Sequence, residues 1–416
     1  MKKIILLTSY LTGLTVIFFL YLLKPFKKIV FVQIKLRSFG FGFDSFNSYL
    51  NMDEYKNLQT SKSLHILWFD NPVPCSKYVK SLFEKKFKTY EFNFFFYSVD
   101  KTLRQFKLKD FYFDIAPLLQ LEKKFFLRKE NEKINFGLSY KNYISFSKNE
   151  INLANETLSS FGLKKSDKWI CIHNRDTAFK IAYCNNNLFE PQVEESVHKY
   201  RNFSVESLKK ASEFFADKGY YVFRIGSDQE NKISFKSKKI IDYSFSKFKN
   251  SFLDIFLLAN CSLYFGSNSG MCSPAITFKR PLAHINFPPL NINISSVYKT
   301  LPSLIKKIVN IHSGNPISIK EMYEKKLMGL SLNNEILNLG YTHVDNTEEE
   351  ILELAIENIE RLEEKSTIVS DEYCEYNKEY LKITNYYNQK YLNESFLKNP
   401  IILGKQFLKK NLYLLN

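Results

Sequence analysis

The chain has 416 residues, of which 45% are hydrophobic and 16% aromatic, and its formal net charge is +16. This much apolar material excludes an intrinsically disordered chain, and the length predicts two globular domains with appended segments. Only 13 Gly and 12 Pro occur, which excludes collagen-like and low-complexity classes.

The positive charge fits three classes of partner: nucleic acid, an anionic membrane surface, and an anionic substrate such as a nucleotide sugar. No zinc-finger spacing, RNA-binding motif or Gly-Arg tract accompanies the charge. We therefore expect no nucleic-acid partner. Part of the Lys and Asn content also fits an AT-rich genome.

The amino end begins with an uncharged stretch of 20 residues, Ile4 to Leu23. As a helix it would reach roughly the 30 Å of a hydrocarbon core, and no small-residue cleavage site follows it. The basic residues Lys24, Lys27 and Lys28 favour a cytoplasmic body. The sequence predicts a single-pass anchor over residues 1–27 in the inner (cytoplasmic) membrane, with an interfacial helix as the alternative.

Residues 28–163 are expected to form a first α/β domain on the acceptor side. Strands are predicted over 28–36, 64–69 and 89–99, and helices over 76–87 and 149–163. Gly40 and Gly42 predict a tight turn after the first strand. Strand, helix and strand at this spacing indicate a parallel sheet.

Residues 164–345 alternate more clearly between strand and helix. The predicted elements are strands 169–173, 220–226, 262–266 and 282–287, and helices 204–218, 251–260 and 271–278. This order is typical of a doubly wound α/β domain, whose chemistry lies at the carboxyl ends of its strands. A capping box of Thr347 and Glu350 opens a helical segment over 346–416.

Polar residues lie at the ends of three of these strands and in the segment "KIIDYS" between them, and together they predict a phosphate site. Arginine offers a planar fork that matches a diphosphate, and small residues opening a helix expose backbone N–H groups to an anion. Each of these residues could instead have a purely structural role, as a core histidine, a surface ion pair, an interdomain salt bridge or an ordinary turn. Their recurrence at successive strand ends favours a site. The candidates are His173, Arg175, Asp176, Arg224, Gly226, Asp242, Ser267, Asn268, Ser269 and Gly270.

No other catalytic set competes with this one. The six His show no metal spacing, and Walker, GxSxG and DxD motifs are absent, so we expect neither an essential metal nor a cofactor. The "FGFGF" stretch is too weak for a dinucleotide fingerprint. The six Cys lack a CxxC pair, which predicts a reducing compartment without a disulfide framework.

Several linked blocks of the second half resemble one known family. "CIHNRDTAF", "YRNFSVESLKKASEFFADKGYYVFRIGS", "FKRPLAHINFPPL" and "GYTHVDNTEEEILELAIENIERL" lie within Ser166 to Leu362. In order and spacing they are similar to an uncharacterised bacterial family of glycosyltransferases that is associated with surface polysaccharides. The chain outside this range matches the family poorly.

A more distant resemblance concerns His173, Arg175 and Asp176. They resemble the HxR element of GT-B fucosyltransferases, and "LDIFLLANCSLYFGSNSG" is similar to a later block of those enzymes. Asn174 stands where the relatives usually have an aliphatic residue.

The resemblance implies a GT-B fold of two Rossmann-like domains and assigns roles within it. Arg175 would hold the diphosphate of the donor with Arg224 beside it, and Ser267 to Gly270 would close on the donor. Asp242 and Asp254 would position the base, the ribose or local loops. A general base would come from the first domain, with Asp44 as first choice and Asp70 as second. Either carboxylate could instead cap a helix.

These inferences predict a membrane-anchored, metal-independent glycosyltransferase. The donor would be a nucleotide-diphosphate sugar and the acceptor a lipid-linked or surface glycan. Two alternatives stay open: another nucleotide-sugar or polysaccharide-modifying enzyme, such as an epimerase or a pyruvyl transferase, and a non-catalytic glycan-binding relative.

Overall fold

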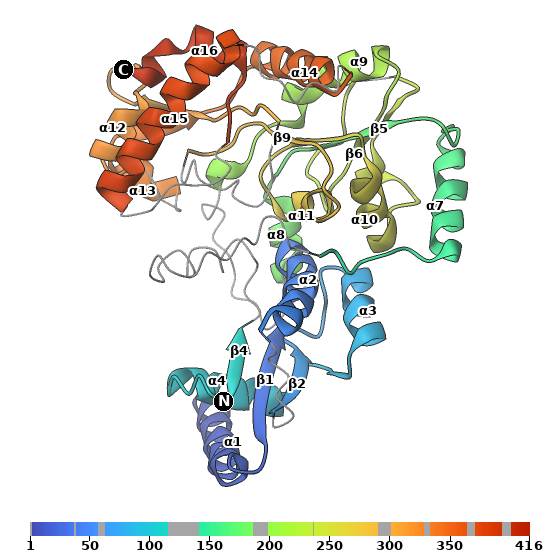
Figure 1. Ribbon diagram of the computed structural model, residues 1–416, viewed down its shortest axis with the longest axis vertical. Helices are drawn as coiled ribbons and strands as arrows, with labels where there is room; N and C mark the ends of the chain where they lie inside the picture. Colours follow the sequence, from blue (N-terminus) through green and yellow to red (C-terminus); the bar gives the residue numbers. More distant parts are fainter. Residues whose placement is uncertain are drawn as a thin grey trace. The chain divides into compact units, whose positions relative to one another are not determined.

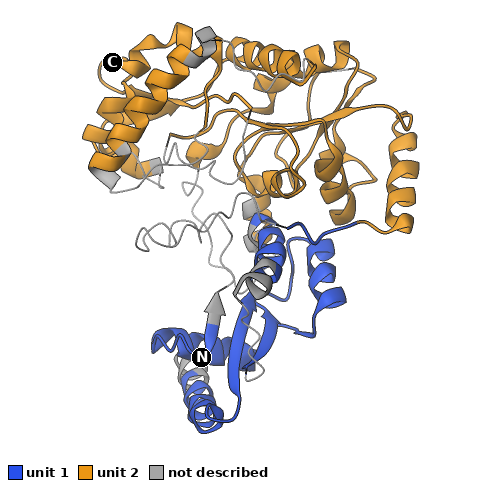
Figure 2. Ribbon diagram, in the orientation of Figure 1, with its two compact units in different colours: residues 1–128, 138–145 blue, residues 129–137, 146–416 orange. Residues whose placement is uncertain are grey.

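The computed structural model describes residues 2–36, 39–56, 63–114, 141–185, 199–235, 237–289, 301–327, 333–363, 371–392 and 401–416. These residues form two compact units (Figure 2). The first lies within residues 1–128 and 138–145, and the second within residues 129–137 and 146–416.

The first unit is built on a parallel sheet, as predicted. Its strands are β1 (Lys28–Ile34), β2 (Ser63–Phe69), β3 (Thr89–Tyr90) and β4 (Tyr112–Asp114), in the order β3-β2-β1-β4. Figure 1 shows β1 between β2 and β4. Its helices are α1 (Lys2–Leu23), α2 (Phe39–Lys56), α3 (Lys77–Lys86) and α4 (Phe94–Gln105). The order of the strands is that of a Rossmann-like half.

The predicted strand over 89–99 is wrong beyond its first two residues. The Asn93 side chain accepts a hydrogen bond from the backbone N–H of Phe96 at 3.0 Å, and this cap starts α4. Phe96, Val99 and Leu103 then bury one face of that helix. Their spacing is helical, and the surrounding aromatic residues hid it in the sequence.

The two glycines after β1 lie in the first turn of α2, so the predicted tight turn is also wrong. A Cβ atom on Gly42 would lie 3.2 Å from the carbonyl oxygen of Lys35. The close backbone approach expected of these glycines is therefore present, although the conformation is helical.

Helix α1 does not support the predicted membrane anchor. Among the described residues, no helix combines the length and hydropathy needed to cross a membrane. α1 packs on α4, where a Cβ atom on Gly13 would lie 2.0 Å from the hydroxyl oxygen of Thr102. Ile17 and Leu20 add to the core of this unit.

The second unit contains the predicted doubly wound sheet. Its strands are β5 (Trp169–His173), β6 (Tyr221–Arg224), β7 (Ile240–Ile241), β8 (Leu263–Gly266) and β9 (Leu282–His284), all parallel, in the order β7-β6-β5-β8-β9. Ile170 and Ile172 enter one hydrophobic core and Cys171 the other, so helices cover both faces. The direction of strand order reverses between β5 and β8, and ligands of such sheets bind at this switch point.

The helices of this unit are α7 (Lys148–Ser160), α8 (Ala178–Asn185), α9 (Lys209–Asp217), α10 (Ser251–Asn260) and α11 (Ser273–Thr277). Short 3-10 turns η1 (Lys199–Arg201), η2 (Val205–Leu208), η3 (Tyr243–Phe245) and η4 (Gly270–Cys272) precede or link them. The Ser204 side chain caps the predicted helix over 204–218, which consists of η2 followed by α9.

The carboxyl end of the chain belongs to the same unit. It contains α12 (Ile319–Glu324), α13 (Asn333–Asn338), the antiparallel pair β10 (Lys307–Asn310) and β11 (Tyr341–Val344), α14 (Glu348–Glu363), α15 (Asp371–Leu392), α16 (Lys405–Lys410) and η5 (Leu412–Leu415). The predicted capping box of Thr347 and Glu350 opens α14. Tyr380 of α15 is buried in the core beside the sheet. The division into units falls before α7, whereas the sequence placed it after that helix.

Candidate functional site

The site starts where β5 and β8 end side by side at the switch point. His173 is the register partner of Gly266, and the backbone N–H of Ser267 donates to the carbonyl of His173 at 2.9 Å. A Cβ atom on Gly266 would lie 2.3 Å from that carbonyl oxygen. Only glycine therefore allows the two strand ends to approach this closely.

Gly266→Ala is expected to destabilise the second unit by about 1–3 kcal/mol, because backbone atoms on both sides leave no room for the methyl group. Gly219→Ala is the matched control: its φ of +96° is strained for alanine, but no atom lies within 4 Å of the added carbon. Thermal unfolding measures both variants. A smaller loss for Gly266→Ala than for Gly219→Ala would contradict the packing described.

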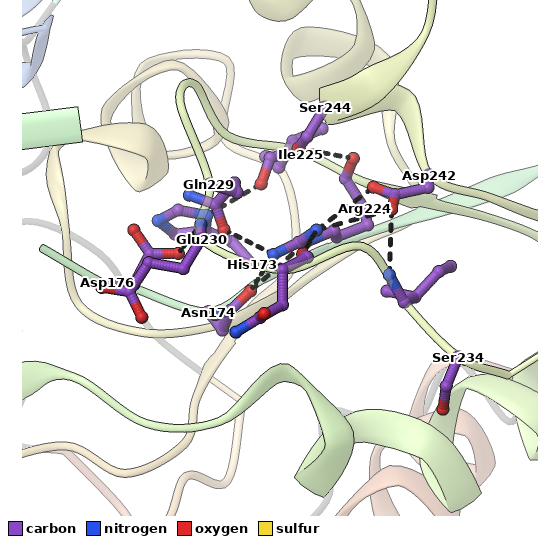
Figure 3. Close-up of polar contacts among 12 residues, drawn as sticks. His173, Asn174, Asp176, Arg224, Ile225, Gln229, Glu230, Ser234, Asp242 and Ser244 are labelled. Carbon is purple, nitrogen blue, oxygen red and sulfur yellow. Dashed lines mark hydrogen bonds and ion pairs between the residues drawn. The ribbon is translucent and has the colours of Figure 1, made fainter. Parts of the chain in front are cut away.

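Arg224, at the end of β6, is fully buried, and protein groups surround it (Figure 3). Its side chain donates to the Asn174 side-chain oxygen at 3.2 Å, to the Gln229 side-chain oxygen at 2.8 Å and to the Asn231 carbonyl at 2.6 Å. It also pairs with Asp242 at 3.3 Å. A guanidinium has five N–H donors, and these partners engage all of them.

Arg224 therefore holds the loop after β6 against the end of β5. The unusual Asn174 takes part in this network. Gly226 is required in the loop because its φ is +148° and Gln229 packs on it. Asp242 also accepts a hydrogen bond from the backbone N–H of Ile233 at 3.0 Å.

Two carboxylates, Asp176 after β5 and Glu230 in this loop, lie side by side (Figure 3). Asp176 accepts from the backbone N–H of Glu230 at 3.1 Å, and Glu230 accepts from the Thr177 hydroxyl at 2.9 Å. Burial raises the pKa of Asp176, and the charge of the Glu230 carboxylate adds to the rise, while the hydrogen bond from the Glu230 backbone opposes it. Both carboxylates keep lone pairs for further hydrogen-bond donors.

A cavity of about 500 Å³ lies beside these residues, and its size is that of a small-molecule site. Its lining is mostly polar and comes from the ends of β5 and β6 and from the segment after η1. The lining residues are Asn174, Asp176, Thr177, Lys199, Asn202, Phe203, Ser204, Val205, Arg224, Glu230 and Asn231.

Arg175 lies next to the cavity but does not line it. Its guanidinium donates to the side-chain oxygen of Asn202, a residue that does line the cavity. Burial, followed by the charge of Arg201, lowers the pKa of Arg175 to about 10. The arginine therefore stays charged at neutral pH, and a second guanidinium lies close to it.

Arg201, in η1, was not among the candidates from the sequence. Its guanidinium donates to the backbone carbonyl of Asn268 in the turn after β8. Lys306 also contacts the segment of Arg201, because its ammonium donates to the carbonyl of Asn202 at 2.7 Å. The same ammonium pairs with Asp345 at 2.6 Å. In the sequence, the basic residues of "KYRN" are the signal that could have identified Arg201 as a site residue. It was missed because this segment does not follow a predicted strand.

The turn at Ser267 to Gly270 is arranged differently from the prediction. The Ser269 hydroxyl accepts from the backbone N–H of Met271 at 3.2 Å, so it caps η4. The predicted helix over 271–278 is η4 followed by the five residues of α11. A helix this short offers little dipole to an anion.

The remaining candidates lie outside the cavity lining. Asp254 in α10 is buried and pairs with Lys249 at 2.5 Å, and burial raises its pKa. Asp70 in the first unit is buried and accepts from the backbone N–H of Leu36 at 2.9 Å. Asp44 lies half-buried in α2 of that unit. Asp254 and Asp70 thus have partners within the protein, and the roles expected of Asp254, Asp70 and Asp44 in donor binding or as a base stay predictions.

Two histidines at the strand ends are neutral. The Nδ1 atom of His173 lies 2.9 Å from the carbonyl oxygen of Ile225, so this nitrogen carries the hydrogen. Burial lowers the pKa of His173 and of His284 to about 4, and the charge of Arg201 contributes to both. Burial also lowers the pKa of His343 to about 4.

These three histidines predict a loss of stability in mild acid. Their pKa is about 6.5 in the unfolded chain and about 4 in the folded chain, so the unfolded state binds more protons between these values. Stability is therefore expected to fall as the pH drops from about 6.5, by at most about 1.4 kcal/mol per pH unit for each histidine.

Urea unfolding at pH 7.5 and pH 5.5 tests this dependence. His284→Phe keeps a ring at the site but removes one titrating group, so it should reduce the change in stability between the two pH values. An unchanged pH dependence in that variant would contradict the assignment.

Among the residues that the structure describes, no group of three or more His, Cys, Asp or Glu side chains is arranged to hold a metal ion.

No protein-family model matches the chain, and no curated protein matches its sequence. Solved structures resemble it in general architecture. One is E. coli ADP-heptose LPS heptosyltransferase II, at 10% identity over 67% of this chain and 90% of that one, with a TM-score of 0.41.

Two further structures resemble the chain at a similar level. A glycosyl transferase of family 9 from Veillonella parvula has 12% identity over 82% of this chain and 98% of that one, with a TM-score of 0.41. An E. coli heptosyltransferase with ADP has 9% identity over 66% and 90%, with a TM-score of 0.30. At these levels of identity, the likeness concerns general architecture and assigns no role to individual residues of this chain.

Proposed function

We propose that the protein is a glycosyltransferase whose donor is a nucleotide-diphosphate sugar and whose acceptor is a lipid-linked or surface glycan. The observation that carries the proposal is the placement of Arg175 at the switch point, beside a polar cavity of about 500 Å³. A charged guanidinium suits a diphosphate, and a cavity lined by Asp176 and Glu230 suits the hydroxyl groups of a nucleoside.

The proposed chemistry is transfer of a glycosyl group. The bond between the anomeric carbon and the diphosphate oxygen breaks, and the diphosphate leaves with the electron pair. An acceptor oxygen bonds to the anomeric carbon, and its proton passes to a carboxylate, for which Asp44 is the candidate. Arg175 stabilises the negative charge that develops on the leaving group.

A cytoplasmic location of the two domains stays a prediction.

A thermal-shift panel on the full chain tests the proposal. The ligands are UDP, GDP and ADP, together with UDP-glucose, GDP-mannose and ADP-glucose. We expect one nucleoside diphosphate and its sugar derivative to raise the melting temperature, because a ligand that binds only the folded state stabilises it. No response to any of the six would contradict the proposal.

The products separate a transferase from the other enzyme classes. A transferase, or its slow hydrolysis of the donor, releases free nucleoside diphosphate. An epimerase would change the sugar without that release. The proposal requires that the protein release nucleoside diphosphate from the sugar nucleotide that stabilises it. Chromatography of the reaction mixture measures this release.

A further inference from the structure

Arg201 brings a second positive charge to the switch point. It reaches the turn after β8 through the carbonyl of Asn268, whereas Arg175 comes from the end of β5. Both side chains are half-buried, and their mutual repulsion contributes to the lowered pKa of Arg175. Two like charges that interact at one edge of the sheet favour the binding of an anion between them.

The partners of Arg201 do not neutralise it. Its guanidinium donates to a backbone carbonyl, and among the described residues no carboxylate forms a salt bridge with its side chain. Its charge also reaches His173 and His284, whose rings are buried and neutral. The neighbouring Lys306 differs, because Asp345 balances it.

The order of strands places these groups in a row along the sheet edge. The loop after β6 contributes Glu230 and Asn231 to the cavity, β5 contributes Arg175, and the turn after β8 holds Arg201. Asn202 connects the cavity with Arg175, because it lines the cavity and its side chain accepts a hydrogen bond from Arg175. A ligand that starts in the cavity therefore meets Arg175 before it meets Arg201.

We propose that Arg201 is a specificity-determining residue that binds the second phosphate of the donor, while Arg175 binds the phosphate next to the nucleoside. The inference rests on the proposed function, and it adds the direction of the donor: nucleoside in the cavity, first phosphate at β5, second phosphate at β8. A nucleoside monophosphate would engage Arg175 alone.

Calorimetric titration of the full chain with UMP and UDP, GMP and GDP, and AMP and ADP tests the inference. We expect the unmodified chain to bind one diphosphate about a hundredfold more tightly than its monophosphate. Arg201→Ala should reduce that preference at least about tenfold and change monophosphate affinity less than about threefold. Arg201→Gln keeps a donor for the Asn268 carbonyl but removes the charge, and it should lose the same preference.

The possible failures are distinct. If the unmodified chain binds no nucleotide, the proposed function falls and the inference falls with it. If nucleotides bind and both variants keep the preference, or weaken monophosphate and diphosphate equally, the inference about Arg201 is wrong while the proposed function stands. If Arg201→Ala does not fold, Arg201→Gln decides between these outcomes.

Discussion

Replacing Arg175 by alanine is expected to weaken binding of the preferred nucleoside diphosphate by roughly a hundredfold, about 2.7 kcal/mol. The guanidinium contributes charge-assisted hydrogen bonds, which are the strong ones, and the pocket beside it shields them from water. Its pKa of about 10 keeps it charged at the pH of the measurement. Calorimetric titration of the full chain gives the affinity.

Two further variants show whether the fork or only the charge matters. Arg175→Lys keeps the charge but not the planar pair of donors, so it should recover only part of the affinity. Lys218→Ala removes a positive charge from an exposed site after α9, at the amino edge of the sheet, and should bind like the unmodified chain. Equal losses in Arg175→Ala and Lys218→Ala would mean that only the overall charge attracts the ligand.

Arg224→Met is expected to destabilise the second unit by about 3–5 kcal/mol, because Asp242 loses its ion-pair partner and the side-chain oxygens of Asn174 and Gln229 lose the donors of Arg224. For a unit of this size the melting temperature should fall by roughly 6–15 °C. Thermal unfolding without ligand measures the loss. A variant as stable as the unmodified chain would contradict the structural role of Arg224.

A double variant separates the lost hydrogen bonds from the unpaired charge. Arg224→Met with Asp242→Asn removes both members of the ion pair, so it should be less destabilised than the sum of the two single variants. Arg175→Ala should lower the melting temperature less than Arg224→Met in the absence of ligand, because Arg175 is half-buried whereas Arg224 is fully buried. The two arginines are thus expected to differ, one affecting stability and the other affinity.

The sequence predicted the parts of the fold that depend on short-range patterns. Strands β5 and β8 are apolar runs that end in polar residues, and the caps at Ser204 and Thr347 are local in the chain. It failed at 89–99, where aromatic residues suit both a strand and a buried helix face. The packing of α1 on α4 joins residues far apart in the chain, such as Gly13 and Thr102, and an uncharged run of residues does not reveal it.

The roles within the site depend on contacts between distant segments. Arg224 ends β6 and Arg175 follows β5, and only the structure shows that protein groups engage the donors of Arg224. Arg201 joins the site through Asn268, which lies 67 residues further along the chain. Asp254 lies within the block that resembles those enzymes, yet its charge pairs with Lys249 of the same local segment. No spacing rule in the sequence encodes these partners.

A crystal structure of the full chain with its preferred nucleoside diphosphate tests the central claim most directly. The account predicts the first phosphate within hydrogen-bond distance of Arg175, the second phosphate beside Arg201, and the nucleoside in the cavity lined by Asp176 and Glu230. A diphosphate bound out of reach of Arg175 would contradict the account.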